Sequence, residues 1–97
     1  MATYITLGKF TEQGIRSVKD TIKRADAVKE AGSKFGVSMQ SIHWVQGQYD
    51  LVAVWEAKDE IALNAFALSV ATAGNVKLET LRAYGRDEMS QILAKMP

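Results

Sequence analysis

The spacing of apolar residues along the chain changes between a period of two and a period of about 3.6, which divides it into strands and helices. Residues 3 to 10 alternate and include Tyr, Ile and Thr, which predicts a first strand. Thr11 then provides a helix N-cap, and Gly36 ends the helix in the left-handed conformation that glycine adopts without a Cβ clash. A break near Asp20 and Thr21 is expected, because these residues can start a new helix. The predicted buried stripe is Ile15, Val18, Ile22, Ala25, Val28 and Phe35.

Residues 38–46 and 49–56 are predicted to form a hairpin that turns at Gly47 and Gln48, where glycine supplies a positive φ. With a two-residue turn, Trp44 lies opposite Leu51, and His43 lies opposite Val52. One face then carries Ile42, Trp44, Tyr49, Leu51, Ala53 and Trp55, and the other carries Met39, His43, Val45, Val52 and Val54. An antiparallel sheet with one solvated face alternates apolar and polar residues, and this hairpin does not. The sheet therefore needs cover on both faces.

The second half of the chain continues the strand and helix pattern. Asp59 is a predicted N-cap, and Gly74 and Asn75 end the helix that follows it. That helix is apolar around most of its circumference, through Ile61, Leu63, Phe66, Leu68 and Val70. Residues 76–84 form a fourth strand, and a short helix begins near Arg86 with the apolar set Met89, Ile92, Leu93 and Met96. The order predicts one α+β domain over residues 1–97, with a ferredoxin-like βαββαβ antiparallel sheet and a C-terminal helix.

The apolar character of both sheet faces predicts self-association. The two main helices cover one face, and a second copy related by a two-fold axis is the simplest source of a matching apolar sheet for the other. A specific interface of this kind buries about 800 Å² per partner. We therefore expect a homodimer or a higher homo-oligomer, in which the C-terminal helix covers its own sheet edge or reaches the partner.

Composition excludes several classes of function. Twelve basic and eleven acidic residues leave a formal charge of +1, which is too little for a nucleic-acid partner. The chain has no cysteine, and His43 is its only histidine, so no metal site is expected within one chain and no cofactor is predicted. Neither a signal peptide nor a run of about 18 apolar residues is present, which predicts a cytoplasmic protein without a membrane partner.

Three separated blocks resemble the GYD domain family. They are TYITLGKFTEQGIRSVKD, GQYDLVAVWEA and AGNVKLETLRAY, and the family signature stands at Gly47, Tyr49 and Asp50. The resemblance covers essentially the whole chain and implies the dimeric α+β barrel fold, whereas the biochemical role of the family is not established. The chain differs from the usual pattern at Ile22 and Lys58, where the family often has proline, and this leaves the start of the first long helix open.

Five residues are candidates for specific roles. Gly47 is interpreted as a turn glycine, and Asp50 as an acceptor for the turn amides or, alternatively, as a catalytic acid. Tyr49 and Trp55 are either core aromatics or the lining of a pocket. His43 is either hydrogen-bonded under a helix or at a dimer interface, or it acts as an acid/base or a haem ligand. His43, Tyr49 and Trp55 are thus the candidate ligand-binding residues, and no catalytic residue is assigned.

The sequence predicts a homo-oligomeric module that binds a small, largely apolar ligand between its sheet and its helices. Two alternatives stay open. One is a cofactor-independent oxygenase or isomerase that uses His43 and Tyr49, and the other is a purely structural or assembly role. The chain contains no Ser-His-Asp set and no glycine-rich phosphate loop. A dry, tightly filled space between the sheet and the helices favours the structural role, and a ligand or buried density beside His43 favours the other two.

Overall fold

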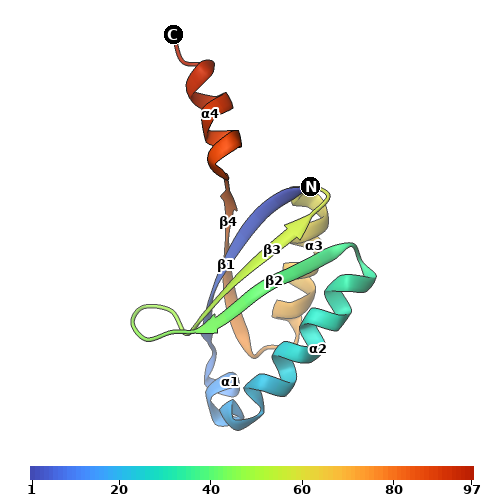
Figure 1. The fold of residues 1–97 in the computed structure, drawn as a ribbon. Helices are drawn as coiled ribbons and strands as arrows, with labels where there is room; N and C mark the ends of the chain where they lie inside the picture. Colours follow the sequence, from blue (N-terminus) through green and yellow to red (C-terminus); the bar gives the residue numbers. More distant parts are fainter.

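The computed structural model describes residues 1–97, and in it a four-stranded antiparallel sheet carries two long helices on one side (Figure 1). The elements are β1 (Ala2–Phe10), α1 (Glu12–Arg16), the 3-10 helix η1 (Val18–Asp20), α2 (Thr21–Lys34), β2 (Val37–Trp44), β3 (Leu51–Ala57), α3 (Glu60–Thr72), β4 (Val76–Ala83) and α4 (Arg86–Ala94). The predicted α+β class and the βαββαβ order with a C-terminal helix are confirmed. No helix combines the length and the apolar character that a membrane span requires.

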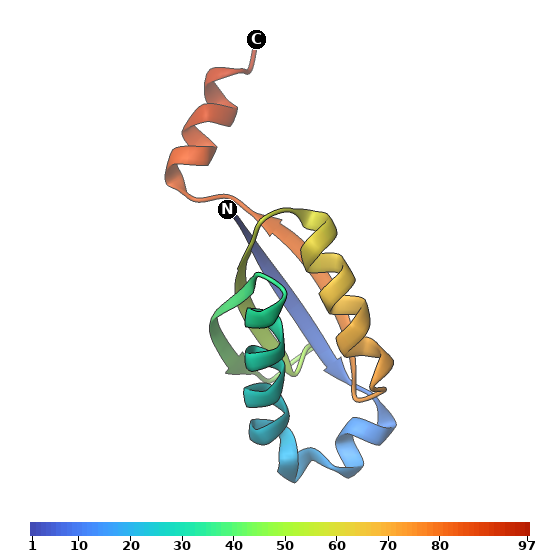
Figure 2. The ribbon, with the colours of Figure 1, turned by 90° about the vertical axis from the view of Figure 1, so that its right-hand side faces the viewer.

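The order of the strands places β3 and β1 at the centre of the sheet and β2 and β4 at its edges. Helix α2 packs against β2, and α3 packs against β4 (Figures 1 and 2). In the centre, Thr6 of β1 pairs with Ala53 of β3, and Gly8 pairs with Leu51. The two helices therefore lie over the edge strands, and the middle of the sheet lies beneath the space between them.

The hairpin keeps the predicted register but not the predicted turn. Trp44 pairs with Leu51, and His43 pairs with Val52, as expected. Because β2 ends at Trp44 and β3 begins at Leu51, six residues connect the strands where two were predicted. Gly47 lies in this connection with a φ of 115°, so the expected positive φ is confirmed.

A β-bulge in β2 corrects one face assignment. The register shifts between Met39 and Ser41, so that one extra residue of β2 has no partner in β3. Met39 consequently pairs with Trp55 and is buried on the helix side of the sheet. The prediction that Met39 shares a face with His43 was wrong, because strict alternation does not hold across a bulge.

The first helical segment is broken where the sequence indicated. Thr11 accepts a hydrogen bond from the Gly14 amide at 3.1 Å, and α2 begins at Thr21, directly after η1. The predicted single buried stripe was wrong: Ile15 is 53% exposed and Ile22 is 63% exposed. The stripe assumed one continuous helix, whereas the chain turns between α1 and α2 and the two parts present different faces to the sheet (Figure 2).

The second half of the chain has correct boundaries but less burial than predicted. Asp59 caps α3 through a bond from the Ala62 amide at 2.9 Å, and Gly74 ends the helix with a φ of 84°. Only one side of α3 is buried, because Ile61 and Leu68 are 77% and 62% exposed. Met89, Ile92 and Leu93 of α4 are also exposed, as is Met96 beyond its end. Helix α4 projects beyond the end of the sheet, away from the other helices (Figures 1 and 2).

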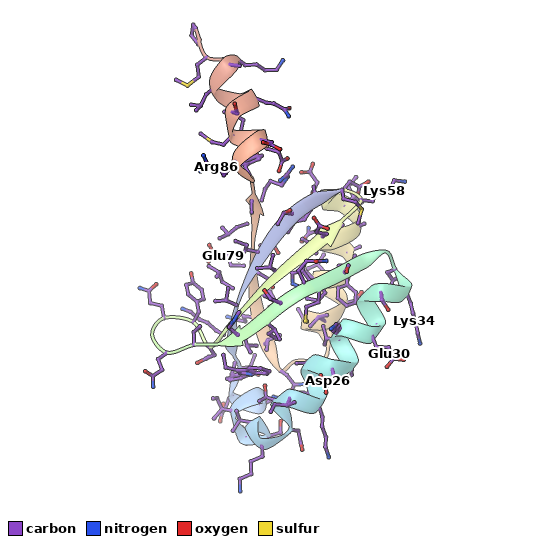
Figure 3. All side chains as sticks on the ribbon, in the orientation of Figure 1. Asp26, Glu30, Lys34, Lys58, Glu79 and Arg86 are labelled. Carbon is purple, nitrogen blue, oxygen red and sulfur yellow. The ribbon has the colours of Figure 1, made fainter.

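The core lies on the helix side of the sheet. Its buried apolar residues are Tyr4, Val37, Met39, Ala53, Trp55, Ala57, Leu63 and Phe66. The opposite side, the open sheet face, carries the apolar residues Ile5, Leu7, Val52, Val54 and Leu81, which the strand pairing places together. No element of the chain covers this face, and Glu79 points from it, away from the helices (Figure 3).

Candidate functional site

A largely apolar cavity of about 320 Å³ lies between the sheet and the helices α2 and α3. Of the 21 residues that line it, 16 are hydrophobic. Thr6, Gly8 and Ala53 of the central strands form its floor, and Val28 of α2 and Phe66 of α3 belong to its walls. A concave, mostly apolar space with a few polar groups is typical of sites that bind small molecules.

The cavity exists because the helices lie over the edge strands and the residues between them are small. On the floor, Gly8 has no side chain and Ala53 has only a methyl group, so neither fills the space between the helices. The packing is much tighter at Gly32 of α2, where a Cβ atom would lie 2.7 Å from the Val37 carbonyl oxygen and 3.2 Å from the Phe66 ring. Helix α2 is therefore in close contact with β2 and α3 near its C-terminal end, and the space lies along the remainder of the sheet.

The aromatic end of the cavity is rigidly packed. The rings of Trp55 and Phe66 meet edge to face with centroids 5.7 Å apart. The Nε1–H group of Trp55 donates to Oγ1 of Thr6 at 3.0 Å, so the indole has its polar group satisfied. Both Trp55 and Thr6 are buried. A ligand at this end would therefore contact apolar surface, and the N–H group of Trp55 would not be free to bind it.

Arg24 is the only ionisable residue of the cavity lining. It is half-buried near the start of α2, and its Nη1 donates to the Ser17 carbonyl oxygen at 2.7 Å and to the Ser17 Oγ at 3.0 Å. Its Nη2 donates to the Gly14 carbonyl oxygen at 3.4 Å. Sequence reasoning missed Arg24 because it falls off the apolar stripe. The available signal was a positive charge in the first turn of a helix, where the helix dipole disfavours it.

The three candidate ligand residues are not brought together. Trp55 lines the cavity, whereas the strand pairing places the exposed His43 on the open sheet face beside Val52. Tyr49 also lies across that face, where its hydroxyl group donates to Oε1 of Glu79 at 2.8 Å. His43 and Tyr49 are therefore separated from the cavity by the sheet itself, and of the three candidates only Trp55 lines the cavity.

The surroundings of Tyr49 change its acidity. The hydrogen bond to Glu79, partial loss of solvent and the negative charge of Glu79 all raise the pKa of Tyr49. The Lys9 ammonium group lies 5.3 Å from the centre of the Tyr49 ring. The tyrosine thus keeps its proton at neutral pH and serves here as a hydrogen-bond donor.

Asp50, which belongs to the GYD signature, continues the hydrogen bonding between β1 and β3 past the last paired residues of the two strands. Its amide donates to the Gly8 carbonyl oxygen at 2.8 Å, and its Oδ2 accepts from the Phe10 amide at 2.9 Å. The carboxylate therefore takes the place of a backbone carbonyl where the chain leaves the sheet. The acceptor role was expected, but the amide that it accepts from belongs to β1, not to the turn.

Arg82 and Glu79 lie on opposite faces of β4. Arg82 pairs in register with Tyr4 on the helix side, and its Nη2 lies 2.7 Å from Oε2 of Glu88 in the first turn of α4. The hydrogen bond from Arg82, together with one from the Gly85 amide, lowers the pKa of Glu88. This ion pair connects α4 to the sheet. No group of three or more histidine or carboxylate side chains is arranged to hold a metal ion.

Comparison with known proteins gives consistent matches. The model of the GYD domain family matches residues 4–93. A protein of Thermus thermophilus named "Glutamine synthetase and cystathionine beta-lyase binding protein" is 33% identical over 87 residues, which cover 86% of this chain and 88% of that protein. The crystal structure of TTHA0845 from the same organism matches with a TM-score of 0.56 and 27% identity, covering 89% of this chain and all of that chain.

Proposed function

The chain belongs to the GYD domain family, and on this premise we propose that it is a homo-oligomeric binding module that holds a small, largely apolar ligand. The cavity between the sheet and the helices is the observation that carries the proposal. Its volume of about 320 Å³ falls at the lower end of ligand pockets, which span about 300 to 1,000 Å³. The lining is mostly apolar, so transfer of an apolar ligand from water into this space is favourable.

A substitution that fills the cavity tests this function. Ala53 lies on the cavity floor, and Ala53→Leu adds three carbon atoms to the space that a ligand would occupy. We expect the wild type to bind 1-octanol in isothermal titration calorimetry, and Ala53→Leu to bind it at least tenfold more weakly. Ala65→Leu makes the same change on the exposed side of α3 and serves as the control. Binding by Ala53→Leu at wild-type strength, or no binding by the wild type, would contradict the proposal.

Two uncovered apolar surfaces support self-association. The open sheet face carries a cluster that includes Leu7, Val54 and Leu81, which no element of the chain covers. Helix α4 projects from the end of the same sheet with its apolar side exposed (Figure 1). A second copy that packs sheet against sheet covers the first surface, and its α4 comes within reach of the other copy. This arrangement matches the homodimer that the sequence predicts.

Binding of another protein is the second candidate function. The relative from Thermus thermophilus is named as a binding protein for two enzymes. In this chain, Ile61 and Leu68 expose an apolar strip on the outer side of α3, which a sheet-to-sheet dimer leaves uncovered. We expect a purified glutamine synthetase or cystathionine β-lyase from the organism that encodes this chain to bind it, and Leu68→Lys to weaken that binding. The matched control is Ser33→Lys, which adds the same charge at an exposed position of α2, outside the strip.

The cavity lining offers little for an enzymatic role. Arg24 is its only ionisable group, and an arginine stays protonated throughout the physiological range. An oxygenase or isomerase that uses His43 and Tyr49 would need its substrate on the open sheet face, outside the cavity. The geometry therefore supports binding over proton-transfer catalysis.

A further inference from the structure

Arg24 has hydrogen-bonding capacity that the protein does not use. A guanidinium group carries five N–H donors in a planar fork. Three hydrogen bonds connect it to neutral oxygen atoms of Ser17 and Gly14, which leaves two N–H groups without a partner. One side of the fork is therefore free while the other is held in place by the segment between α1 and α2.

The positive charge of Arg24 is also uncompensated. The chain contains two ion pairs, Arg16 with Glu12 and Arg82 with Glu88, and neither involves Arg24. No carboxylate oxygen lies within 4.0 Å of the Arg24 guanidinium group, although the residue is half-buried at an apolar cavity. Burial of a charged group is costly unless the group is paired, so this position favours an anionic partner over a neutral or cationic one.

The cavity has an apolar end and a polar end. Trp55 and Met39 pair with each other in the sheet, near the end of α2 that carries Gly32. Arg24 lies near the start of α2, at the end of the sheet where β4 begins with Val76 (Figure 2). A ligand that lies along the helices would thus have hydrocarbon and aromatic surface at one end of the cavity and Arg24 at the other end.

Resting on the proposed function, we infer that the ligand is an amphiphilic carboxylic acid. Its hydrocarbon part packs against Trp55 and Phe66, and its carboxylate accepts two hydrogen bonds from the free side of the Arg24 fork. Carboxylate and guanidinium groups match in planar, bidentate geometry. At ~30 Å³ for each water-sized group, the volume of about 320 Å³ holds about ten non-hydrogen atoms. Octanoate, which has ten, is a suitable probe.

Comparison of three probes with the same hydrocarbon chain tests the inference. We expect the wild type to bind octanoate about tenfold more tightly than 1-octanol, and octylammonium more weakly than either, since a charge-assisted hydrogen bond is about twice as strong as a neutral one. Titration is followed by the fluorescence of Trp55 in a Trp44→Phe background, where it is the only tryptophan. If 1-octanol and octanoate bind equally, the inference fails and the proposed function stands. If neither binds, both fail.

Variants of Arg24 separate ligand binding from its bonds within the protein. Arg24→Gln should bind octanoate no better than it binds 1-octanol, and Arg24→Lys should recover part of the preference because it keeps the charge without the fork. Arg16→Gln removes an exposed charge outside the cavity and should behave as the wild type. A preference for octanoate that persists in Arg24→Gln would overturn the assignment. Because the three probes are compared with Arg24 intact, a folding defect in Arg24→Gln leaves that comparison unaffected.

Discussion

Replacing Asp50 by alanine tests whether the family signature serves structure. The carboxylate accepts a hydrogen bond from the Phe10 amide at 2.9 Å, beyond the last residue of β1 that pairs with β3. Asp50→Ala leaves that N–H group without its partner in a half-buried position. The carboxylate extends the hydrogen bonding of the sheet, so the variant should lose stability while its cavity stays intact.

The magnitude follows from the single bond that is lost. A hydrogen bond to a charged group contributes about 1.5 to 3 kcal/mol, and the partial exposure of Asp50 favours the lower value. For a domain of this size, each kcal/mol shifts Tm by about 4 to 8 °C. Asp50→Ala should therefore melt about 6 to 12 °C below the wild type. Asp50→Asn keeps a neutral acceptor oxygen and should lose roughly half as much.

The assay is thermal unfolding by circular dichroism at one fixed protomer concentration, because the Tm of an oligomer depends on concentration. Asp26→Ala, an exposed change on α2, is the matched control and should stay within about 0.5 kcal/mol of the wild type. Well below its Tm, Asp50→Ala should still bind 1-octanol. A Tm equal to that of the wild type would refute the role of Asp50 in extending the sheet. A loss of 1-octanol binding in the folded Asp50→Ala variant would show that Asp50 acts on the cavity.

Three further outcomes are expected. In light scattering, the wild type should have a mass of about 21 kDa, twice the 10.7 kDa of one chain. Val54→Lys should approach the monomer mass, because it puts an ammonium group on the open sheet face. A monomeric wild type would contradict the dimer. Gly14→Ala should unfold at a much lower temperature than Gly85→Ala. The Cβ atom added at position 14 would clash with the Asn75 carbonyl oxygen, whereas no atom lies near the Cβ position of residue 85. Equal Tm values would argue against the close packing of Gly14 on Asn75. The raised pKa of Tyr49 means that its protonated hydroxyl group stabilises the folded state. This stabilisation should be fully present below the ordinary tyrosine pKa of about 10 and should be lost as the pH rises through the raised pKa. In alkaline unfolding curves, Tyr49→Phe should not show this loss.

The sequence determined the local structure because the relevant forces act over a few residues. Thr11 and Asp59 cap the amides that follow them, and their positions mark the helix starts correctly. Gly36 and Gly47 adopt a positive φ, as the pattern predicted, since glycine alone lacks the Cβ that opposes it. The alternation of the strands also predicted the register of β2 with β3, and from these elements the fold class followed.

Only the tertiary structure decided which side chains form the candidate site. One bulge moved Met39 to the helix side. Alternation predicted Tyr49 on the face of Trp55, which was wrong, because Tyr49 lies in the connection between β2 and β3 and bonds to Glu79 on the face away from the cavity. The cavity itself results from helices that lie over edge strands and from small residues such as Ala53 between them. Arg24 reaches it because the break before α2 redirects that helix. These features depend on how distant segments pack in three dimensions, and residue spacing along the chain carries no direct record of that packing.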